Sequence, residues 1–288
     1  MARILGIGIA TLDIINIVDE YPREDDEIRA MEQRIARGGN VTNMLVVLSQ
    51  LGHQCCWGGI LGAEPDAKII TNDLAKFGID MQHVRTDQAG RVPTSYITAS
   101  RSTGSRTIIH YRDLDEFRIA DFAGIDLGTF DWLHFEGRNI SETLVMVKQA
   151  TNNYPDLKVS IEIEKHRPTV ELLFGYADAL FFSKPFVIGT GNHDPAAFLS
   201  DMHNRFPDTE LVCSWGADGA CAIDHNGVVL RCPASPPPEV VDTIGAGDTF
   251  IAAYIDARLR KLAPREALDY ANHIAGQKCG HQGFDFLL

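Results

Sequence analysis

Short apolar runs alternate with amphipathic segments along most of the chain. The segments at residues 41–51, 66–77 and 141–150 have the apolar spacing of helices. Several of the runs are apolar on consecutive residues, which is typical of strands covered on both faces. This alternation predicts an α/β fold with a mostly parallel central sheet. The predicted strands lie at residues 4–9, 55–60, 132–135, 159–163, 179–182 and 211–215.

Two regions do not follow this rhythm. Residues 14–36 and 93–112 alternate apolar with polar residues and are predicted to be extended. The second region is interrupted at residues 102–105 by Ser-Thr-Gly-Ser, which favours a hairpin turn. We expect a small β-sheet lid over the ligand end of the central sheet, which also offers a dimer surface. The 288 residues then form one domain, residues 1–288, with the two lid segments inserted in it.

Composition excludes several classes of function. The formal net charge of −13 argues against nucleic acid, whose binding depends on basic patches. No run of about 18 apolar residues predicts a membrane helix, and the N-terminus lacks the pattern of a signal peptide. The six cysteines include no CxxC pair and lie mostly in apolar runs. We expect buried free thiols in a cytoplasmic protein.

A first group of polar residues surrounds the end of the first predicted strand. Asp13 follows that strand, and Gly38-Gly39-Asn40 precedes the helix at residues 41–51. Asn40 and Asn43 are three positions apart and can face the same space. One carboxylate and two amides suit the hydroxyl groups of a sugar, which both donate and accept hydrogen bonds. The alternatives are a turn residue at Asp13, a helix cap at Asn40 and local packing at Asn43.

The N-terminal glycines also suggest a dinucleotide-binding turn. Gly6 and Gly8 follow one another at the required spacing, but Thr11 stands where the third glycine belongs. Asp13 comes too early for the acid that binds a ribose, which lies about 20 residues further on. A nicotinamide enzyme is therefore disfavoured.

The string DTIGAGDTF at residues 242–250 combines a glycine turn, a carboxylate and a helix start. Gly245 and Gly247 allow a ligand to approach the backbone, and the amides that begin the helix attract anions. The amides of Ala246, Gly247 and Asp248 suit a transferring phosphoryl group, and the Asp248 carboxylate suits a general base. No Walker A loop is present. The alternative is that Asp248 only caps the helix.

Together these two strings resemble the paired signatures of the ribokinase-like (PfkB) carbohydrate kinases. Gly38-Gly39-Asn40 is similar to the sugar signature, and DTIGAGD is similar to the C-terminal signature. The chain resembles the ketohexokinase (fructokinase) branch in particular. That likeness runs through YPREDDEIR at 21–29, RGGNVTN at 37–43, FEGRN at 135–139, VSIEIEK at 159–165, PPPEVVD at 236–242 and KCGHQGFD at 278–285.

The resemblance implies a three-layer α/β/α fold with a β lid that pairs between two subunits. It implies transfer of the γ-phosphoryl group of ATP to a sugar hydroxymethyl group, with Mg²⁺ and, as a further candidate, K⁺. Asp248 is then the catalytic base, and Gly245, Ala246 and Gly247 form the anion hole. The sugar residues are then Asp13, Gly39, Asn40 and Asn43.

Other positions match the family more loosely. Asp25 matches a lid aspartate that reaches the partner subunit's sugar in the ketohexokinase branch. Arg106 matches an arginine near the nucleotide phosphates. The turn at residues 216–219 and residues 272–280 fall where the adenine pocket is expected. The predicted nucleotide-binding residues are Arg106, Gly216, Gly219, Asn272 and Cys279.

One departure from the family leaves the metal ligands unknown. Many members carry an NxxE motif linked to magnesium, whereas this chain has FSKPF at residues 182–186. Ketohexokinase-like sequences depart there too. Glu162 and Glu164 are candidates to assist the metal, with ordinary strand-end carboxylates as the alternative.

The function predicted from these residues is a sugar kinase that acts on a ketose such as fructose. The alternatives are a kinase for ribose, another sugar, a sugar derivative or a nucleoside, and a non-catalytic sugar-binding regulator. A phosphorylated or sulfonated sugar requires cationic partners. Arg37, Arg138 and Lys165 are candidates for that role.

Overall fold

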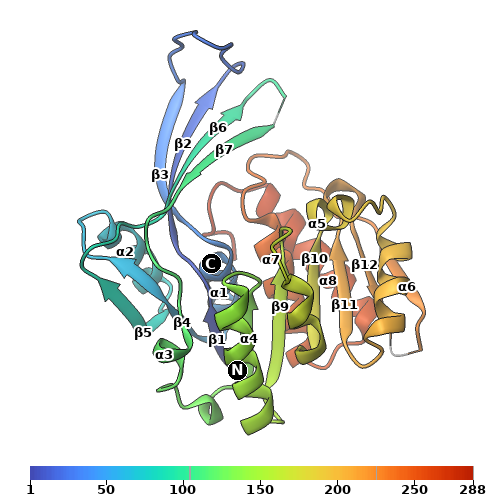
Figure 1. Cartoon of the computed structure of the whole chain (residues 1–288). Helices are drawn as coiled ribbons and strands as arrows, with labels where there is room; N and C mark the ends of the chain where they lie inside the picture. Colours follow the sequence, from blue (N-terminus) through green and yellow to red (C-terminus); the bar gives the residue numbers. More distant parts are fainter. Residues whose placement is uncertain (104, 225, 288) are drawn as a thin grey trace.

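The computed structural model describes residues 1–287 except residues 104 and 225. The larger of two sheets has nine strands in the order β13-β12-β11-β10-β9-β8-β1-β4-β5 (Figure 1). The strands from β11 to β5 in that order run parallel, and β12 is antiparallel to both of its neighbours, β11 and β13. The predicted mostly parallel sheet is confirmed. Its strands are β1 (Arg3–Ile7), β4 (Gln54–Gly62), β5 (Asp80–Asp87), β8 (Trp132–Glu136), β9 (Lys158–Ile163), β10 (Ala179–Ser183), β11 (Glu210–Ser214), β12 (Ala220–Ile223) and β13 (Val229–Cys232).

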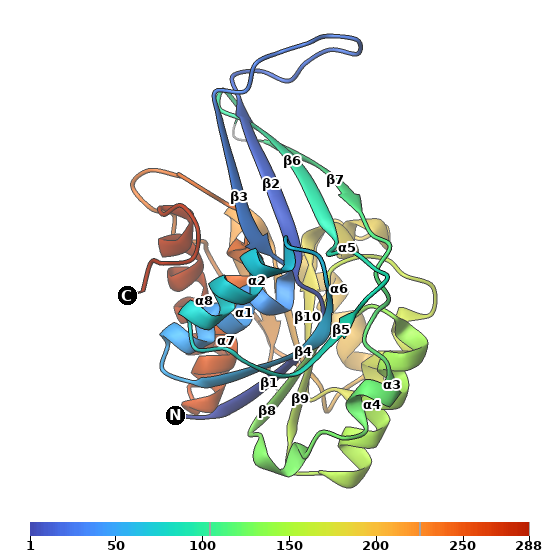
Figure 2. The ribbon, with the colours of Figure 1, turned by 90° about the vertical axis from the view of Figure 1, so that its left-hand side faces the viewer.

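Helices cover both faces of this sheet (Figures 1 and 2). Helices α1, α2, α7 and α8 pack on one face, and α3 to α6 pack on the other. In β1, Ile4 belongs to the first core and Leu5 to the second, which explains the apolar residues at consecutive positions. The helices are α1 (Asn40–Gln50), α2 (Ala67–Lys76), α3 (Ile119–Phe122), α4 (Ile140–Asn153), α5 (Lys184–Gly189), α6 (Pro195–Arg205), α7 (Ala246–Leu259) and α8 (Pro264–Cys279). Short 3-10 turns are η1 (Leu127–Thr129), η2 (Val170–Tyr176) and η3 (Gly216–Asp218).

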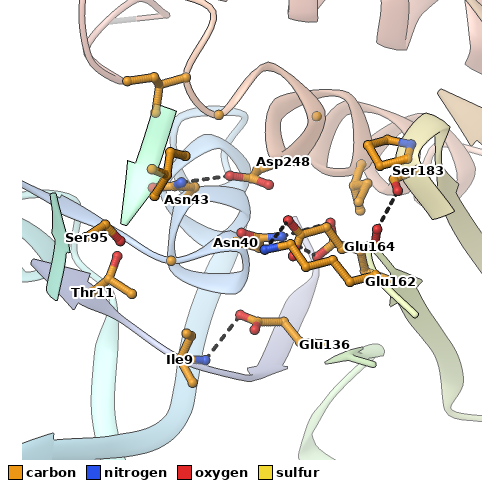
Figure 3. A pocket seen from close by; sticks show the side chains of 18 of the residues that line it. Ile9, Thr11, Asn40, Asn43, Ser95, Glu136, Glu162, Glu164, Ser183 and Asp248 are labelled. Atoms are coloured by element: carbon orange, nitrogen blue, oxygen red, sulfur yellow. Dashed lines mark hydrogen bonds and ion pairs between the residues drawn. The ribbon is translucent and has the colours of Figure 1, made fainter. Parts of the chain in front are cut away.

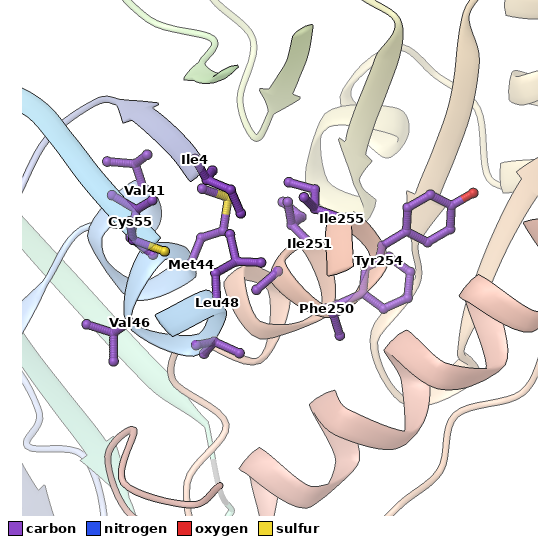
Figure 4. Close-up of a cluster of buried hydrophobic side chains, with 14 of the residues drawn as sticks. Ile4, Val41, Met44, Val46, Leu48, Cys55, Phe250, Ile251, Tyr254 and Ile255 are labelled. Atoms are coloured by element: carbon purple, nitrogen blue, oxygen red, sulfur yellow. The ribbon is translucent and has the colours of Figure 1, made fainter. Parts of the chain in front are cut away.

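The pair α1 and α7 matters most for function. Met44 and Leu48 of α1 face Ile251 and Ile255 of α7 across a fully apolar contact, with Ile4 of β1 beside them (Figure 4). Each of these side chains stabilises the fold by about 1.5–3 kcal/mol on burial. The contact therefore holds the first turns of two helices, some two hundred residues apart in sequence, in a fixed relation.

The smaller sheet has the order β3-β2-β6-β7 and contains β2 (Thr11–Val18), β3 (Glu32–Gly38), β6 (Thr94–Ser100) and β7 (Arg106–Tyr111). β2 and β6 are parallel, while β3 and β7 are antiparallel to their neighbours. The predicted small second sheet is confirmed. The hairpin turn predicted at residues 102–105 includes residue 104, which lies outside the described residues. The sheet projects from the carboxyl edge of the large one (Figure 2).

The prediction of extended structure throughout residues 14–36 is wrong in the middle of that range. Residues 19–31 form an irregular connection between β2 and β3. This stretch carries Pro22 among many charged residues, so it offers no alternating apolar face to bury and no regular set of amide donors. Asp25 lies there, exposed, at a φ of 67°.

The structure also bears on the predictions about membrane helices and cysteines. None of the helices in the described part of the chain is long and apolar enough to cross a membrane. All six cysteines are free thiols; five are buried and Cys279 is half-buried. The expectation of buried free thiols is therefore confirmed for five of the six.

Candidate active site

A cavity of about 780 Å³ lies where the small sheet meets the carboxyl edge of the large sheet (Figure 3). A second cavity of about 380 Å³ adjoins it, and the two share Arg106, Ser214, Gly216, Thr243, Ala246 and Gly247. Asp25 lines neither. Predicted site residues that line the first cavity are Asp13, Gly39, Asn40, Asn43, Arg106, Gly216, Gly245, Ala246, Gly247 and Asp248. Those that line the second are Arg106, Gly216, Gly219, Ala246, Gly247, Asn272 and Cys279.

Asp248 and Asn43 contact each other in the wall of the larger cavity (Figure 3). Asn43 Nδ2 donates a hydrogen bond of 2.7 Å to Asp248 Oδ2. Burial raises the pKa of Asp248 to about 7; the Asn43 bond and Arg37 oppose the rise, and Glu164 and Glu136 add to it. A carboxyl group that titrates near neutral pH and faces a cavity is suited to proton transfer.

The glycine turn shapes the backbone beside Asp248. Gly245 has a φ of 77°, and a side chain there would also overlap the ring of Phe284. Helix α7 begins at the next residue, inside the motif rather than after it. Ala246 N lies 3.3 Å from Thr243 O in a turn, whereas the amides of Gly247 and Asp248 have no helical acceptor. The latter two amides are the better anion donors.

Hydrogen bonds of Asp242 stabilise this turn. Its carboxylate accepts from Arg34 at 2.7 Å and from Ile244 N at 2.9 Å. The buried ammonium group of Lys278 donates to Asp242 O at 2.9 Å. Although burial alone raises the pKa of Asp242, Lys278, Arg34 and the Ile244 amide lower it overall, so the carboxylate stays charged.

The small sheet supplies the opposite wall of the cavity. Asp13, Ser95 and His110 are register partners on β2, β6 and β7, and all three line the cavity. Burial raises the pKa of Asp13, while hydrogen bonds from Thr11 and Ser95 oppose the rise. Arg106 Nη1 reaches across to Thr243 Oγ1 at 2.9 Å. The small sheet therefore contacts the glycine turn at residues 242–248 directly.

Gly39 lets α1 begin next to the end of β1. Its φ is 106°, and a side chain there would overlap Ile9 O. Glu136, at the end of β8, accepts from Ile9 N at 3.1 Å and from Val41 N at 3.0 Å (Figure 3). This residue was missed from the sequence, although it directly follows a predicted strand. It fixes the first turn of α1 and thereby Asn40.

Asn40 and Glu162 form a second polar pair in the cavity. Asn40 Nδ2 lies 3.0 and 3.1 Å from the two carboxylate oxygens of Glu162. The pKa of Glu162 is raised by burial first, and further by Asp248, Glu164 and Glu136. Four carboxylates therefore share this region, and a cation would stabilise their charged forms.

A magnesium ion fits this donor set. Among the described residues no three His, Cys, Asp or Glu side chains converge as a ready metal cage. Mg²⁺ commonly uses one or two carboxylates together with waters and substrate phosphates. Glu162 and Glu164 both line the cavity and would hold it. Ser183, where the family's motif is absent, instead caps α5 and donates to Glu164 O at 2.6 Å.

Most arginines and lysines that line the cavity pair with carboxylates, but Arg106 and Arg167 form no ion pair among the described residues. Arg112 Nη1 lies 2.6 Å from Glu116, and Arg138 Nε lies 3.0 Å from Glu136. Lys165 pairs with Glu164 at 3.1 Å. Arg37 does not line the cavity: it turns away toward Asp73. The sequence analysis named Arg37, Arg138 and Lys165 as candidate partners for a charged sugar. Of these, Arg37 lies outside the cavity.

The smaller cavity has a largely apolar wall. Its wall includes Val240 and Phe250, together with the predicted Gly219, Asn272 and Cys279. Asn272 Nδ2 donates to Cys232 O at 3.3 Å, so this amide also supports the wall. The shared boundary with the larger cavity lies at the first turn of α7.

Comparisons with known proteins agree with this geometry. Residues 1–287 match the family described as pfkB family carbohydrate kinase. The chain is 40% identical over 291 residues to ketohexokinase from Mus musculus, covering 98% of each chain. Among solved structures, ribokinase from Giardia lamblia has a TM-score of 0.84 at 16% identity, with 98% of this chain and 94% of that one covered. Arabidopsis thaliana ribokinase, solved with ribose and ATP, has a TM-score of 0.79 at 18% identity over 98% and 94% of the two chains.

The likeness to the solved structures shows the fold, and it confirms the predicted three-layer arrangement. The family match over almost the whole chain and the 40% identity to ketohexokinase confirm the resemblance on which the sequence prediction rested. The chain therefore belongs to the pfkB family of carbohydrate kinases.

Proposed function

We propose that this kinase transfers the γ-phosphoryl group of ATP to the hydroxymethyl oxygen of a neutral ketose such as fructose. The observation that carries the proposal is the position of Asp248. Its carboxylate stands in the larger cavity at the first turn of α7, where the two cavities share a boundary. A sugar in one cavity and a nucleotide in the other would meet at this residue.

In this proposal Asp248 accepts the proton of the sugar hydroxyl as its oxygen forms a bond to the γ-phosphorus. The bond from that phosphorus to the β,γ-bridging oxygen breaks, and ADP leaves. The amides of Gly247 and Asp248 stabilise the charge on the phosphoryl oxygens, and Arg106 lies at the same boundary. Magnesium, when bound near Glu162 and Glu164, would neutralise charge on the phosphates.

The polar residues of the sugar end favour a neutral substrate. Asp13, Asn40 and Asn43 provide both donors and acceptors for hydroxyl groups. The nearby cations Arg112 and Arg138 are already neutralised by Glu116 and Glu136. A phosphate or sulfonate bound to Arg112 or Arg138 would have to compete with these carboxylates. Ribose, another sugar, a sugar derivative and a nucleoside remain the alternative substrates.

A coupled assay of ADP release tests the proposal. The panel contains fructose, ribose, glucose, fructose 1-phosphate and adenosine, each with ATP and Mg²⁺. We expect the highest kcat/KM for fructose, and Asp248→Asn run in parallel excludes contaminating kinase activity. A preference for a phosphosugar or nucleoside would overturn the neutral-ketose proposal. No ADP release with any acceptor would favour a non-catalytic sugar-binding protein. Replacing K⁺ by choline tests whether potassium contributes.

We also propose a homodimer through the small sheet, which we call the lid in that role. Ile35, Ile14, Tyr96 and Ile109 are register partners across all four strands. They lie on the face opposite the Asp13 row, because successive residues of a strand point to opposite faces. Ile35, Tyr96 and Ile109 are 52%, 49% and 69% exposed. An exposed apolar row of this kind suits a second copy of the same sheet.

In such a dimer Asp25 would approach the partner subunit's cavity. Light scattering at assay concentration should give a mass near twice 31.7 kDa. Ile109→Asp should yield monomers, and Lys158→Asp, a charge change at the amino end of β9 and away from the small sheet, should not. A monomeric wild-type chain would contradict the dimer. A cytoplasmic location belongs to the same proposal, supported by the five buried free thiols.

A further inference from the structure

Arg37 is a buried arginine that lies behind the cavity rather than in it. Its side chain is 1% exposed. Nε lies 2.6 Å from the Asp73 carboxylate, which belongs to α2. Nη1 donates to Asn43 Oδ1 at 2.6 Å and to Thr42 Oγ1 at 3.2 Å. Asn43 in turn donates to Asp248 at 2.7 Å. An unbroken chain of hydrogen bonds thus connects α2 to the carboxylate in the cavity.

The chemistry of this chain allows only one orientation for the amide. A guanidinium group donates and never accepts, so Asn43 must turn its oxygen toward Arg37. Its NH₂ group must then face Asp248. An N–H donor favours the ionised carboxylate and holds Oδ2, which leaves Oδ1 of Asp248 for the substrate proton. Without Arg37, the amide can rotate by half a turn and present an oxygen that repels the ionised base.

Arg37 is itself fixed on every side. Asp73 holds its Nε, and the ring of Phe284 lies 5.4 Å from the guanidinium carbon. Thr42 Oγ1 donates onward to Gly38 O at 2.9 Å. The planar guanidinium group, with this many fixed partners, positions the Asn43 amide more rigidly than a flexible lysine ammonium group would.

We propose that Arg37 is a positioning residue for Asp248, acting through the orientation of the Asn43 amide. This proposal deepens the proposed function, because it rests on Asp248 as the base. Arg37 touches neither cavity, so it is not a ligand for sugar or nucleotide.

The charged groups around Asp248 set the expected pH effect. Glu136 of β8, together with Glu162 and Glu164 at the end of β9, disfavour its ionised form, and Arg37 from β3 is the cation that opposes them. Loss of Arg37 therefore raises the pKa of Asp248. Because the base works in its ionised form, the acid side of the activity profile must then move to higher pH.

The test compares Arg37→Met, Arg37→Lys and Arg258→Met. Arg258 is the matched control, because it lies on α7, the helix that carries Asp248. Its Nε pairs with Glu210 of β11 at 3.0 Å, and neither Arg258 nor Glu210 lines the cavity. We expect Arg37→Met to lower kcat about 10- to 100-fold, the effect of a small misplacement of a reacting group. The sugar KM should change less than kcat. The apparent pKa on the acid side of the kcat profile should shift upward by about half to one pH unit.

Arg37→Lys should recover part of the loss in kcat, because an ammonium group still donates to Asn43. Arg258→Met should retain wild-type kcat and pH profile even if its melting temperature falls. Wild-type kcat in Arg37→Met, or an unchanged acid limb in Arg37→Met, would overturn the proposal. If Arg37→Met does not fold, Arg37→Gln, which also removes the charge, replaces it in both measurements. High turnover in Asp248→Asn would instead overturn the base itself, so the two failures are distinguishable.

Discussion

The two sheets solve the problem of burial in opposite ways. The nine-stranded sheet is covered on both faces, and most of its apolar side chains are inaccessible to solvent. The small sheet has one face toward the cavity and leaves Tyr96 and Ile109 exposed on the other. Every residue of β7 is exposed. The large sheet is a rigid support for reacting groups, whereas the small one is a thin wall with one face open to solvent.

This difference indicates separate roles for the two sheets in catalysis and in sugar binding. Asp248 and the anion donors stand on a helix that packs into the large core, so their positions depend on tightly packed apolar contacts. Asp13 stands on the small sheet, which is joined to the turn by Arg34 and Arg106. We therefore expect the chemistry to depend on the first region and sugar affinity to depend on the second.

The largest effect should come from Asp248→Asn. Asparagine keeps the size of the side chain but cannot accept the substrate proton as a base. We expect kcat to fall by about 10² to 10⁴-fold with sugar binding largely retained. Steady-state kinetics and sugar titration by calorimetry measure the two quantities separately. Turnover near the wild-type value would remove Asp248 from the mechanism.

A matched pair of truncations tests the contrast in burial. Leu48→Ala removes a fully buried side chain between α1 and α7, and should lower the free energy of unfolding by about 2–5 kcal/mol. Ile109→Ala removes a side chain that is 69% exposed, and should cost less than about 0.5 kcal/mol in the monomer. Urea denaturation of both variants gives the comparison. Equal losses would mean that the small sheet is already covered.

Asp13→Ala should act on affinity. A buried carboxylate that accepts from sugar hydroxyls contributes about 1.5–3 kcal/mol, so the sugar KM should rise roughly 10- to 150-fold. The KM for ATP should stay near its original value. An unchanged sugar KM would place the sugar elsewhere in the cavity. A comparable loss of kcat would argue that the small sheet takes part in the chemistry.

The pH profile gives the smallest and most specific effect. Because burial raises the pKa of Asp248 to about 7, the base is largely protonated below neutrality. We expect kcat/KM to fall about tenfold per pH unit below that value and to level off above it. Stopped assays across pH 5.5–9, with protein stability checked at each pH, measure this. A flat profile down to pH 5.5 would show that Asp248 stays ionised.

Much of the fold was predictable because burial on both faces leaves a periodic signal. All six predicted strands and three predicted helices are present within two or three residues of their expected ends. β5 was missed because it is a partly exposed edge strand with a polar sequence, and β12 and β13 because each has only four residues. Residues 19–31 were wrongly predicted to be extended, because this charged stretch contains a proline and has no apolar face to bury.

The sequence by itself determined the residue types of the site: two asparagines at a helix start and one aspartate after a glycine turn. The glycines at 39 and 245 also permit the positive φ angles that the structure shows there. Only the tertiary structure decided which groups meet. Arg37 faces Asn43 instead of the substrate, Glu136 holds the start of α1, and Glu162 stands among carboxylates. Local patterns encode backbone geometry, whereas the pKa of Asp248 depends on charges and burial supplied by strands and helices from the whole length of the chain.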